Sequence, residues 1–298
     1  MNSRLLLNLA LVIVVAVLGL IAWLQPGLDK PAAPPRLTDL DPAAINRIRI
    51  VDRDGPTIVL ARKDGRWRIE EPIQLPANGF RIDSLLRLTG EASYGQLEVA
   101  EIELAELGLD TPRIRLYLND REFAFGTTEP IDGRRYVRTG DIVHLITDRY
   151  FHIMTAGPTD LVNQHLLPAD GRITEITTPD WRLARTEDKW VLTPERPGLS
   201  ADAVNMVVDN WRQAQAVWIQ PYEQSEAKGR IVVRLEGEEQ PLQFDILAQE
   251  PELVLARPDA GVQYHLAEES ARGLLEFREP AIEPEQENDE ETVPPNLD

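Results

Sequence analysis

Hydrophobic and polar positions alternate in the same way in two stretches of the chain. "TIVLARKDGRWRIEEP", starting at Thr57, alternates on both sides of a Lys-Asp-Gly turn, and "DWRLARTEDKWVLTPE", starting at Asp180, does so again 123 residues later. Period-two alternation is typical of strands with one buried face, and a short turn between two such runs predicts a β-hairpin. We therefore predict two hairpins, with Trp67 and Trp190 at equivalent positions pointing into the core.

After each hairpin the hydrophobic period changes from two to that of a helix. Apolar residues recur at i, i+3 and i+4, which is the stripe of an amphipathic helix. Ser200 stands where a side-chain oxygen would cap the second helix, and Asp202 falls in its first turn. We expect each helix to cover the apolar face of its own sheet. The stripes are Ile82, Leu85 and Leu86 in the first copy and Val204, Val207, Val208 and Trp211 in the second.

The same order of elements continues in both copies. A second hairpin is predicted in "RIRLYLNDREFAFG" and in "RIVVRLEGEEQPLQFDI", and each copy then closes with one strand, "YVRTGDIVHLI" or "LVLARPDAGVQYHLA", and a short helix. Only "ELGLDTP" (Glu106 to Pro112) lacks a counterpart in the second copy. This recurrence predicts a duplicated α+β unit of about 110 residues, a common domain size.

The N-terminal segment has a different pattern. Leu5 to Leu24 form an apolar run of 20 residues with Asn8 as the only strongly polar side chain. As a helix the run would span roughly the 30 Å of a bilayer core, and it is longer than the apolar region of a cleaved signal peptide. We interpret it as an uncleaved signal anchor, with the N-terminus in the cytoplasm and the bulk of the chain in the periplasm.

These patterns predict five regions. Four prolines follow the anchor and favour an extended stalk, and the C-terminus combines eight carboxylates with four prolines, which is typical of a disordered tail. The fold class is therefore α+β, with two tandem domains of antiparallel sheet and helix behind a transmembrane helix. The regions are 1–24 (anchor), 25–44 (stalk), 45–168 (repeat 1), 169–278 (repeat 2) and 279–298 (acidic tail).

The amino-acid composition excludes several kinds of functional site and partner. The chain carries 50 acidic and 31 basic residues, a formal charge of -19, which disfavours nucleic acid as a partner. It has no cysteine, so thiolate metal sites, iron–sulfur clusters and cysteine nucleophiles are excluded. The glycine-rich loops that bind nucleotide phosphates and the serine motifs of hydrolases are also missing. We therefore expect no cofactor and no catalytic residues.

Three residues are candidates for contact with a partner or a ligand. His144 and His265 precede a leucine on the closing strand of each copy, and two imidazoles could converge on a metal or an anion. The alternative, which we favour, is an outward-facing histidine whose neighbours Leu145 and Leu266 face inward. Trp218 belongs to a cluster of tryptophans in the second copy that could form a stacking platform, although the strand and helix phases point Trp190 and Trp211 of that cluster at the core.

The order of these motifs resembles a known bacterial family. "GRWRIEEP", "RIDSLLRLTGEA", "ELGLDTPRIRLYL", "RRYVR", "VHLI" and "TDLVNQHLLP" together are similar to the family called domain of unknown function 4340, over roughly residues 45–275. The resemblance implies a membrane-anchored envelope protein. Some relatives are encoded beside ABC-transporter and gliding-type auxiliary proteins, which implies an accessory role, and the resemblance assigns no catalytic residue.

Three functions remain open at this stage. The first is a non-enzymatic, single-pass protein of the inner membrane whose exported domains contact other envelope proteins, for example in an ABC-transporter-like complex. The second is a module that binds envelope glycan or peptide. The third, which we rank last, is a hydrolase using carboxylates. The sequence does not indicate an oligomeric state.

Overall fold

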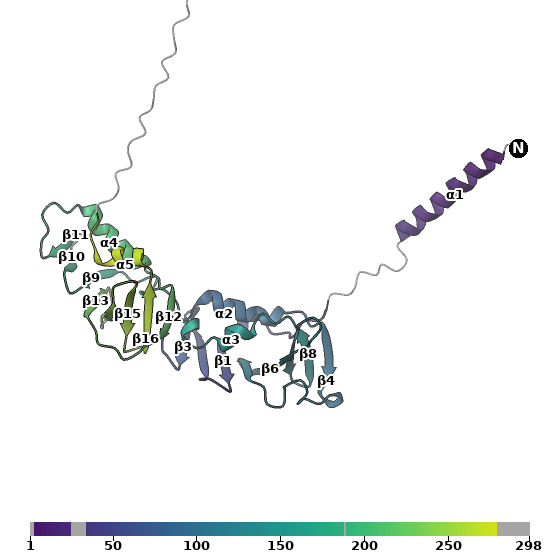
Figure 1. The fold of residues 1–298 in the computed structure, drawn as a ribbon, viewed down its shortest axis with the longest axis horizontal. Helices are drawn as coiled ribbons and strands as arrows, with labels where there is room; N and C mark the ends of the chain where they lie inside the picture. The colour runs from purple at the N-terminus through teal and green to yellow at the C-terminus, as the bar shows by residue number, and fades with distance from the viewer. Residues whose placement is uncertain (1–2, 25–33, 188, 279–298) are drawn as a thin grey trace, which may run out of the picture.

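Two antiparallel sheets of eight strands each make up most of the computed structural model, which describes residues 3–24, 34–187 and 189–278 (Figure 1). The first sheet contains β1 (Arg47–Asp52), β2 (Ile58–Lys63), β3 (Arg66–Glu71), β4 (Gly95–Glu98), β5 (Ile114–Leu118), β6 (Arg121–Thr128), β7 (Arg135–Thr139) and β8 (Ile142–Ile146). The second contains β9 (Ile173–Thr177), β10 (Arg182–Thr186), β11 (Lys189–Thr193), β12 (Trp218–Pro221), β13 (Gly229–Leu235), β14 (Leu242–Ala248), β15 (Leu253–Arg257) and β16 (Val262–Leu266).

The two sheets have the same topology. The strand order is β3-β2-β1-β5-β6-β7-β8-β4 in the first sheet and β11-β10-β9-β13-β14-β15-β16-β12 in the second, so each strand has a counterpart eight numbers later. An eight-stranded order that recurs without a change is what a duplicated unit predicts. The α+β class and the tandem arrangement of two sheets are confirmed.

The predicted hairpins form in both copies. β2 pairs with β3 across a turn in which Asp64 and Gly65 have φ of 51° and 77°, the left-handed values that a two-residue hairpin turn requires. In the second copy β10 pairs with β11, and Glu187 in its turn has φ of 56°. Trp67 is buried, as its strand phase predicts.

The predicted helices also form, and they cover the apolar faces of the sheets. The helices of the two domains are α2 (Gly79–Leu86), α3 (Phe151–Thr155), α4 (Ala201–Gln213) and α5 (Glu268–Leu275). All the residues of the two predicted stripes are buried. The Ser200 hydroxyl caps α4 by accepting a hydrogen bond from the Ala203 N–H at 3.1 Å. Figure 1 shows α4 and α5 side by side over the second sheet.

Each closing strand of the sequence analysis is in fact a hairpin. The segment predicted as one strand in the first copy divides into β7 and β8 around Gly140, which has φ of 60°, and its counterpart divides into β15 and β16 around Gly261, which has φ of 68°. The edge strands β4 and β12 were not predicted. Each has four residues, too few for a recognisable alternation.

The segment present only in the first copy forms a small core on the far side of the first sheet. The Leu107 carbonyl accepts a hydrogen bond from the Thr127 N–H at 2.8 Å, and the Leu109 side chain packs with Ala124. A Cβ on Gly126 would lie 2.2 Å from the Leu107 oxygen, so this close approach requires glycine. The insertion therefore has a structural role in the first domain.

Residues 161–167, between the two sheets, join the two domains through backbone hydrogen bonds to each of them. We call this segment the linker. In the first domain the Asn78 N–H donates to the Leu161 carbonyl at 2.7 Å, and the Asn163 N–H donates to the Pro76 carbonyl at 2.9 Å. In the second domain the Leu166 N–H donates to the Ala214 carbonyl at 3.1 Å. The linker therefore makes one isolated antiparallel bridge to each domain, Val162 to Ala77 and His165 to Gln215.

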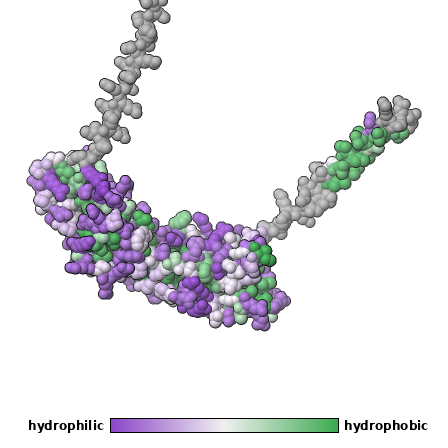
Figure 2. All heavy atoms as spheres, in the orientation of Figure 1, coloured by the Kyte–Doolittle hydropathy of each residue, from purple (hydrophilic) through white to green (hydrophobic). Residues whose placement is uncertain are grey.

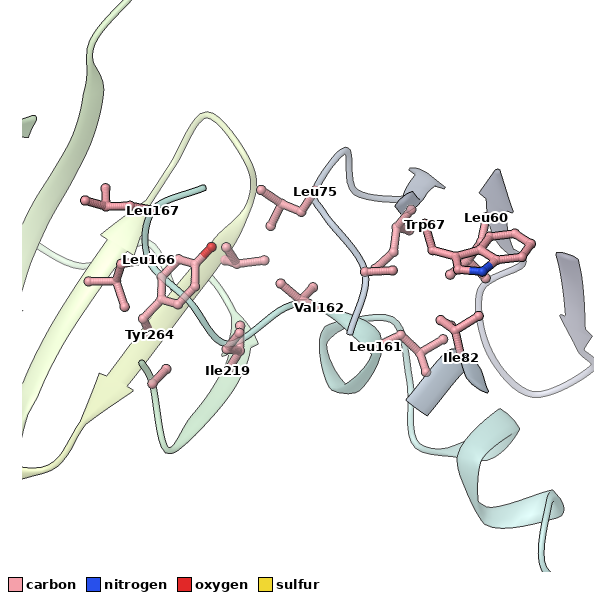
Figure 3. Packing of buried hydrophobic residues seen from close by; sticks show 14 of the residues in the cluster. Leu60, Trp67, Leu75, Ile82, Leu161, Val162, Leu166, Leu167, Ile219 and Tyr264 are labelled. Atoms are coloured by element: carbon pink, nitrogen blue, oxygen red, sulfur yellow. The ribbon is translucent and has the colours of Figure 1, made fainter. Parts of the chain in front are cut away.

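Apolar side chains bury this junction. Leu161 lies beside Ile82 of the first domain and Val162 bridges Ala77, and a few residues later Leu166 and Leu167 lie near Tyr264 of the second domain (Figure 3). One continuous cluster of buried side chains runs through both domains. We infer that the two domains form one rigid body, because separating them would expose this surface.

The structure bears differently on the predicted anchor (1–24) and on the predicted stalk (25–44). Helix α1 spans Ser3–Leu24, and none of the helices, taken over the described residues, combines the length with the hydropathy that a bilayer crossing requires. The anchor therefore stays a prediction. Of the predicted stalk, residues 25–33 lie outside the described residues, and the rest packs on the first domain, where Leu37 is buried and its N–H donates to the Glu91 carbonyl at 2.8 Å.

The junction predicts a stability effect. Leu161 is 0% exposed, so Leu161→Ala should lower the free energy of unfolding by about 2 to 5 kcal/mol, the usual effect of removing a buried leucine side chain. The measurement is urea unfolding of the full chain in detergent. Ile131→Ala, at a position that is 88% exposed, is the matched control and should change the free energy by less than about 0.5 kcal/mol. Equal effects of the two substitutions would contradict the buried linker.

Candidate contact surfaces

His144 is buried, which corrects the outward orientation that we favoured. Its Nδ1 lies 3.0 Å from the Ser93 hydroxyl, and that hydroxyl donates its single proton to the Gly95 carbonyl at 3.0 Å. His144 Nδ1 is therefore the donor in the first contact, which fixes the neutral tautomer with its proton on Nδ1. Burial lowers the pKa of His144 below its usual value, because a buried imidazolium loses its hydration. Leu145, expected inside, is only half-buried.

His265 is also buried, but in a different set of contacts. Its Nδ1 lies 2.7 Å from a Glu252 carboxylate oxygen, and its Nε2 lies 3.1 Å from the Gln263 side-chain nitrogen. The Gln263 oxygen accepts from the Glu223 N–H, which orients the amide so that its nitrogen faces the histidine. These contacts give both ring nitrogens of His265 a hydrogen-bond partner.

Trp218 and His265 are brought together, whereas His144 bonds within the other domain. Trp218 pairs with His265 across strands β12 and β16, and the two rings stack with centroids 3.6 Å apart and planes at 16°. In the first copy the position opposite His144 is Gln96, so the stacked pair exists only in the second domain. The histidines of the two copies therefore do not share a site. Among the described residues no group of three or more His, Asp or Glu side chains is arranged to hold a metal ion.

Glu91 and Tyr150, a third pair of hydrogen-bonded polar residues, line a pocket in the first domain. The Tyr150 hydroxyl donates to the buried Glu91 carboxylate, and burial, together with the hydrogen bond to Glu91, raises the pKa of Tyr150. The phenol therefore stays protonated and remains a donor. Arg81, Arg87 and Arg149 line the same pocket, which has a volume of about 630 Å³.

An open groove with several apolar side chains lies at the outer edge of the second sheet. Between β11 and the start of α4 a groove of about 900 Å³ is lined by Trp190, Val191, Leu192, Leu199, Val204 and the rim residue Arg196. We call it the β11 groove. Val191 is 49% exposed there, and Trp190 and Leu192 are only half-buried. On the visible face of the two domains hydrophilic side chains are interrupted by several hydrophobic patches (Figure 2).

In the first domain the counterpart of this groove is covered. There the loop after β3 runs back along the strand, so that the Ile69 N–H donates to the Leu75 carbonyl and the Ala77 N–H donates to the Trp67 carbonyl, both at 2.9 Å. Leu75 and Ala77 of this loop are buried against the strand. Leu161 and Val162 of the linker lie along the same loop, where the Asn78 N–H donates to the Leu161 carbonyl and Val162 bridges Ala77 (Figure 3).

In the second domain the loop after β11 does not cover the edge. Pro197 and Leu199 are the counterparts of Leu75 and Ala77, counted from Pro194 and Pro72. Pro197 is exposed and Leu199 is half-buried. The duplicated fold therefore has the same edge twice, covered in one copy and open in the other.

Reasoning from the sequence did not identify the β11 groove, although a signal was present. The outward-facing positions of β3 hold Arg66, Arg68 and Glu70, whereas those of β11 hold Lys189, Val191 and Thr193. A valine in place of Arg68 makes the central part of β11 apolar on both faces. An apolar residue on the outer face of an edge strand often marks an interaction surface.

The topology and these surfaces define the class of the protein: a duplicated α+β protein with an open sheet edge. The family model described as "Domain of unknown function (DUF4340)" matches residues 67–227, more than half of the chain. The chain belongs to this family, which confirms the resemblance inferred from its motifs. No curated protein and no solved structure matches the chain.

The buried neutral His144 predicts a pH dependence of stability. Because the folded protein binds this proton less readily than the unfolded chain, the free energy of unfolding should fall as the pH drops from about 7 to 5, through the ordinary range of histidine. His144→Gln should make this slope shallower in urea unfolding measured at several pH values. His152→Gln, at an exposed position, is the control and should leave the slope unchanged. An NMR titration that places the His144 pKa at or above 6.5 would refute the assignment.

Proposed function

We propose that this protein is a non-enzymatic accessory protein of the bacterial cell envelope whose two domains make contact with another envelope protein. The open β11 edge is the observation that carries the proposal. Extended segments of partner proteins commonly add a strand to such an edge, with main-chain hydrogen bonds supplying affinity and side-chain pockets supplying specificity. Trp190, Leu192 and Val204 offer the apolar pocket that such a segment needs.

The rigid junction supports the same proposal. A partner that binds the second domain is held at a fixed position relative to the first domain, because the linker is paired and buried on both sides. The apolar N-terminal run of the sequence would place both domains at the inner membrane, with their bulk in the periplasm. We propose an ABC-transporter-like complex as one setting for this contact, on the strength of what the family resemblance implies.

The contact can be tested by crosslinking in cells. With a photoreactive residue at position 191, we expect one discrete adduct with a membrane-associated protein, identified by mass spectrometry. A residue at position 131, in the first domain, is the control, because Ile131 is even more exposed than Val191, at 88% against 49%, but lies outside the β11 groove. Leu192→Asp should reduce the adduct at least about tenfold, the effect of losing ~1.4 kcal/mol of contact energy. An adduct that forms equally well from both positions, or that survives Leu192→Asp, would refute the proposal.

One observation favours a second candidate function, binding of an envelope glycan or peptide. Trp218 is 43% exposed and has one ring face stacked on His265, so its other face is available for stacking. If this surface binds a glycan, peptidoglycan fragments should quench tryptophan fluorescence in a saturable way, and Trp218→Ala should abolish the quenching. Quenching that persists in Trp218→Ala would place the ligand elsewhere, and no quenching in the parent protein would remove this candidate.

A further inference from the structure

Three arginines line the pocket that Glu91 and Tyr150 share in the first domain. Arg81 and Arg87 come from the side of α2, and Arg149 comes from the chain just before α3. We call this the arginine pocket. Its volume of about 630 Å³ suits a small ligand or a headgroup. In a protein with a formal charge of -19, a pocket with an excess of positive charge favours an anion.

The protein itself does not neutralise these arginines. Among the described residues, Glu91 is the one carboxylate that lines the pocket; it accepts the Tyr150 hydroxyl and lies 3.9 Å from Arg149. Within the described ranges, Arg81 and Arg87 form no ion pair and donate no side-chain hydrogen bond. Arg81 is also half-buried, so it loses less freedom on binding than a fully exposed side chain would. Two guanidinium groups are therefore available to a ligand.

The electrostatics of Tyr150 indicate that two of the arginines approach the same point. Burial and the hydrogen bond to Glu91 raise the pKa of Tyr150, whereas the positive charges of Arg149 and Arg87 oppose this rise. Arg87 ends α2 and Arg149 precedes α3, so the two charges reach the phenol from different elements. Guanidinium groups that converge in this way can bind one anionic group together.

The second domain shows that the fold does not require these arginines. The N-caps of α2 and α4 give the register of one helix pair, and the equivalent histidines of the closing hairpins give the register of the other. None of the counterparts is basic: Ala203 for Arg81, Asp209 for Arg87 and Ser270 for Arg149.

The helices of the second domain also leave less space between them. There α4 and α5 are hydrogen-bonded directly, since the Asn210 side-chain nitrogen donates to the Gly273 carbonyl at 2.9 Å and the Trp211 ring nitrogen donates to the Leu274 carbonyl at 3.0 Å. In the first domain α2 has only 8 residues against 13 in α4, and the arginine pocket lies between α2, the start of α3 and the linker. The two copies therefore differ in the space as well as in the charge between their helices.

We propose that the arginine pocket binds the phosphate or diphosphate group of a small ligand or a lipid headgroup, held by Arg81, Arg87 and Arg149. Guanidinium groups match phosphate oxygens in pairs, and a phosphate monoester or diphosphate carries the multiple charge that three arginines can balance. Phe80, which is 76% exposed on the same pocket, offers an apolar contact to the rest of the ligand. This site is separate from the β11 groove and does not depend on the proposed function.

Isothermal titration calorimetry of the full chain in neutral detergent tests the ligand class. The probes are inorganic pyrophosphate, phosphatidic acid in mixed micelles, and acetate. At least one phosphate probe should bind saturably, and acetate should bind at least about tenfold more weakly, because it carries a single charge. Binding of pyrophosphate indicates that the phosphate group alone is recognised, whereas binding of phosphatidic acid alone indicates a lipid headgroup. Absence of saturable binding by both phosphate probes, or equal binding of acetate, overturns the proposal.

Substitutions locate the site. Arg81→Gln should weaken binding at least about tenfold, because it removes charge-assisted hydrogen bonds. Arg68→Gln removes the same charge from an exposed position of β3 outside the pocket and should leave binding unchanged. Urea unfolding checks that each variant folds, and Arg87→Gln, at an exposed position, should weaken binding in the same way if Arg81→Gln does not fold. Unchanged binding in the folded pocket variant, or equal weakening by Arg68→Gln, overturns the proposal.

Discussion

An exposed edge strand must be covered or paired, and this constraint explains most of the molecule. The outer edge of the first sheet is covered twice, by the loop after β3 and by the linker, and the linker continues into the second domain. Because the linker is hydrogen-bonded to both domains and its Leu161 and Leu166 are buried, the domains cannot separate without exposing these side chains. The duplication then leaves a second edge of identical topology, β11, that the described residues do not cover in this way.

The sequence predicted the repeating elements because each one has a local signal. The hairpins follow from period-two alternation around turns such as Asp64–Gly65, and the helices follow from stripes that end in a cap such as Ser200. The closing segments are hairpins and not the single strands predicted for them, because Gly140 and Gly261 each form a turn within an otherwise apolar run. Strands β4 and β12 were missed because their pairing partners, rather than their own residues, determine them.

The candidate surfaces were predictable only in part, because they depend on tertiary contacts. Trp218 and His265 were both singled out from the sequence, but their stacking depends on the pairing of β12 with β16. His144 was expected outside and is inside, since β8 is covered on both faces and its Ser93 partner arrives from a distant loop. The difference between a covered β3 and an open β11 depends on the path of a loop, although Val191 in place of Arg68 indicates it in the sequence.

The central claim is that the duplicated domains differ at one sheet edge, which is closed in the first and open in the second. Residue-resolved amide hydrogen exchange of the full chain measures this most directly. The Ile69 N–H donates to the Leu75 carbonyl, whereas among the described residues no loop carbonyl accepts from the N–H of its counterpart Leu192. We predict exchange at Leu192 at least about tenfold faster than at Ile69 under the same conditions. Equal protection of the two amides would contradict the account.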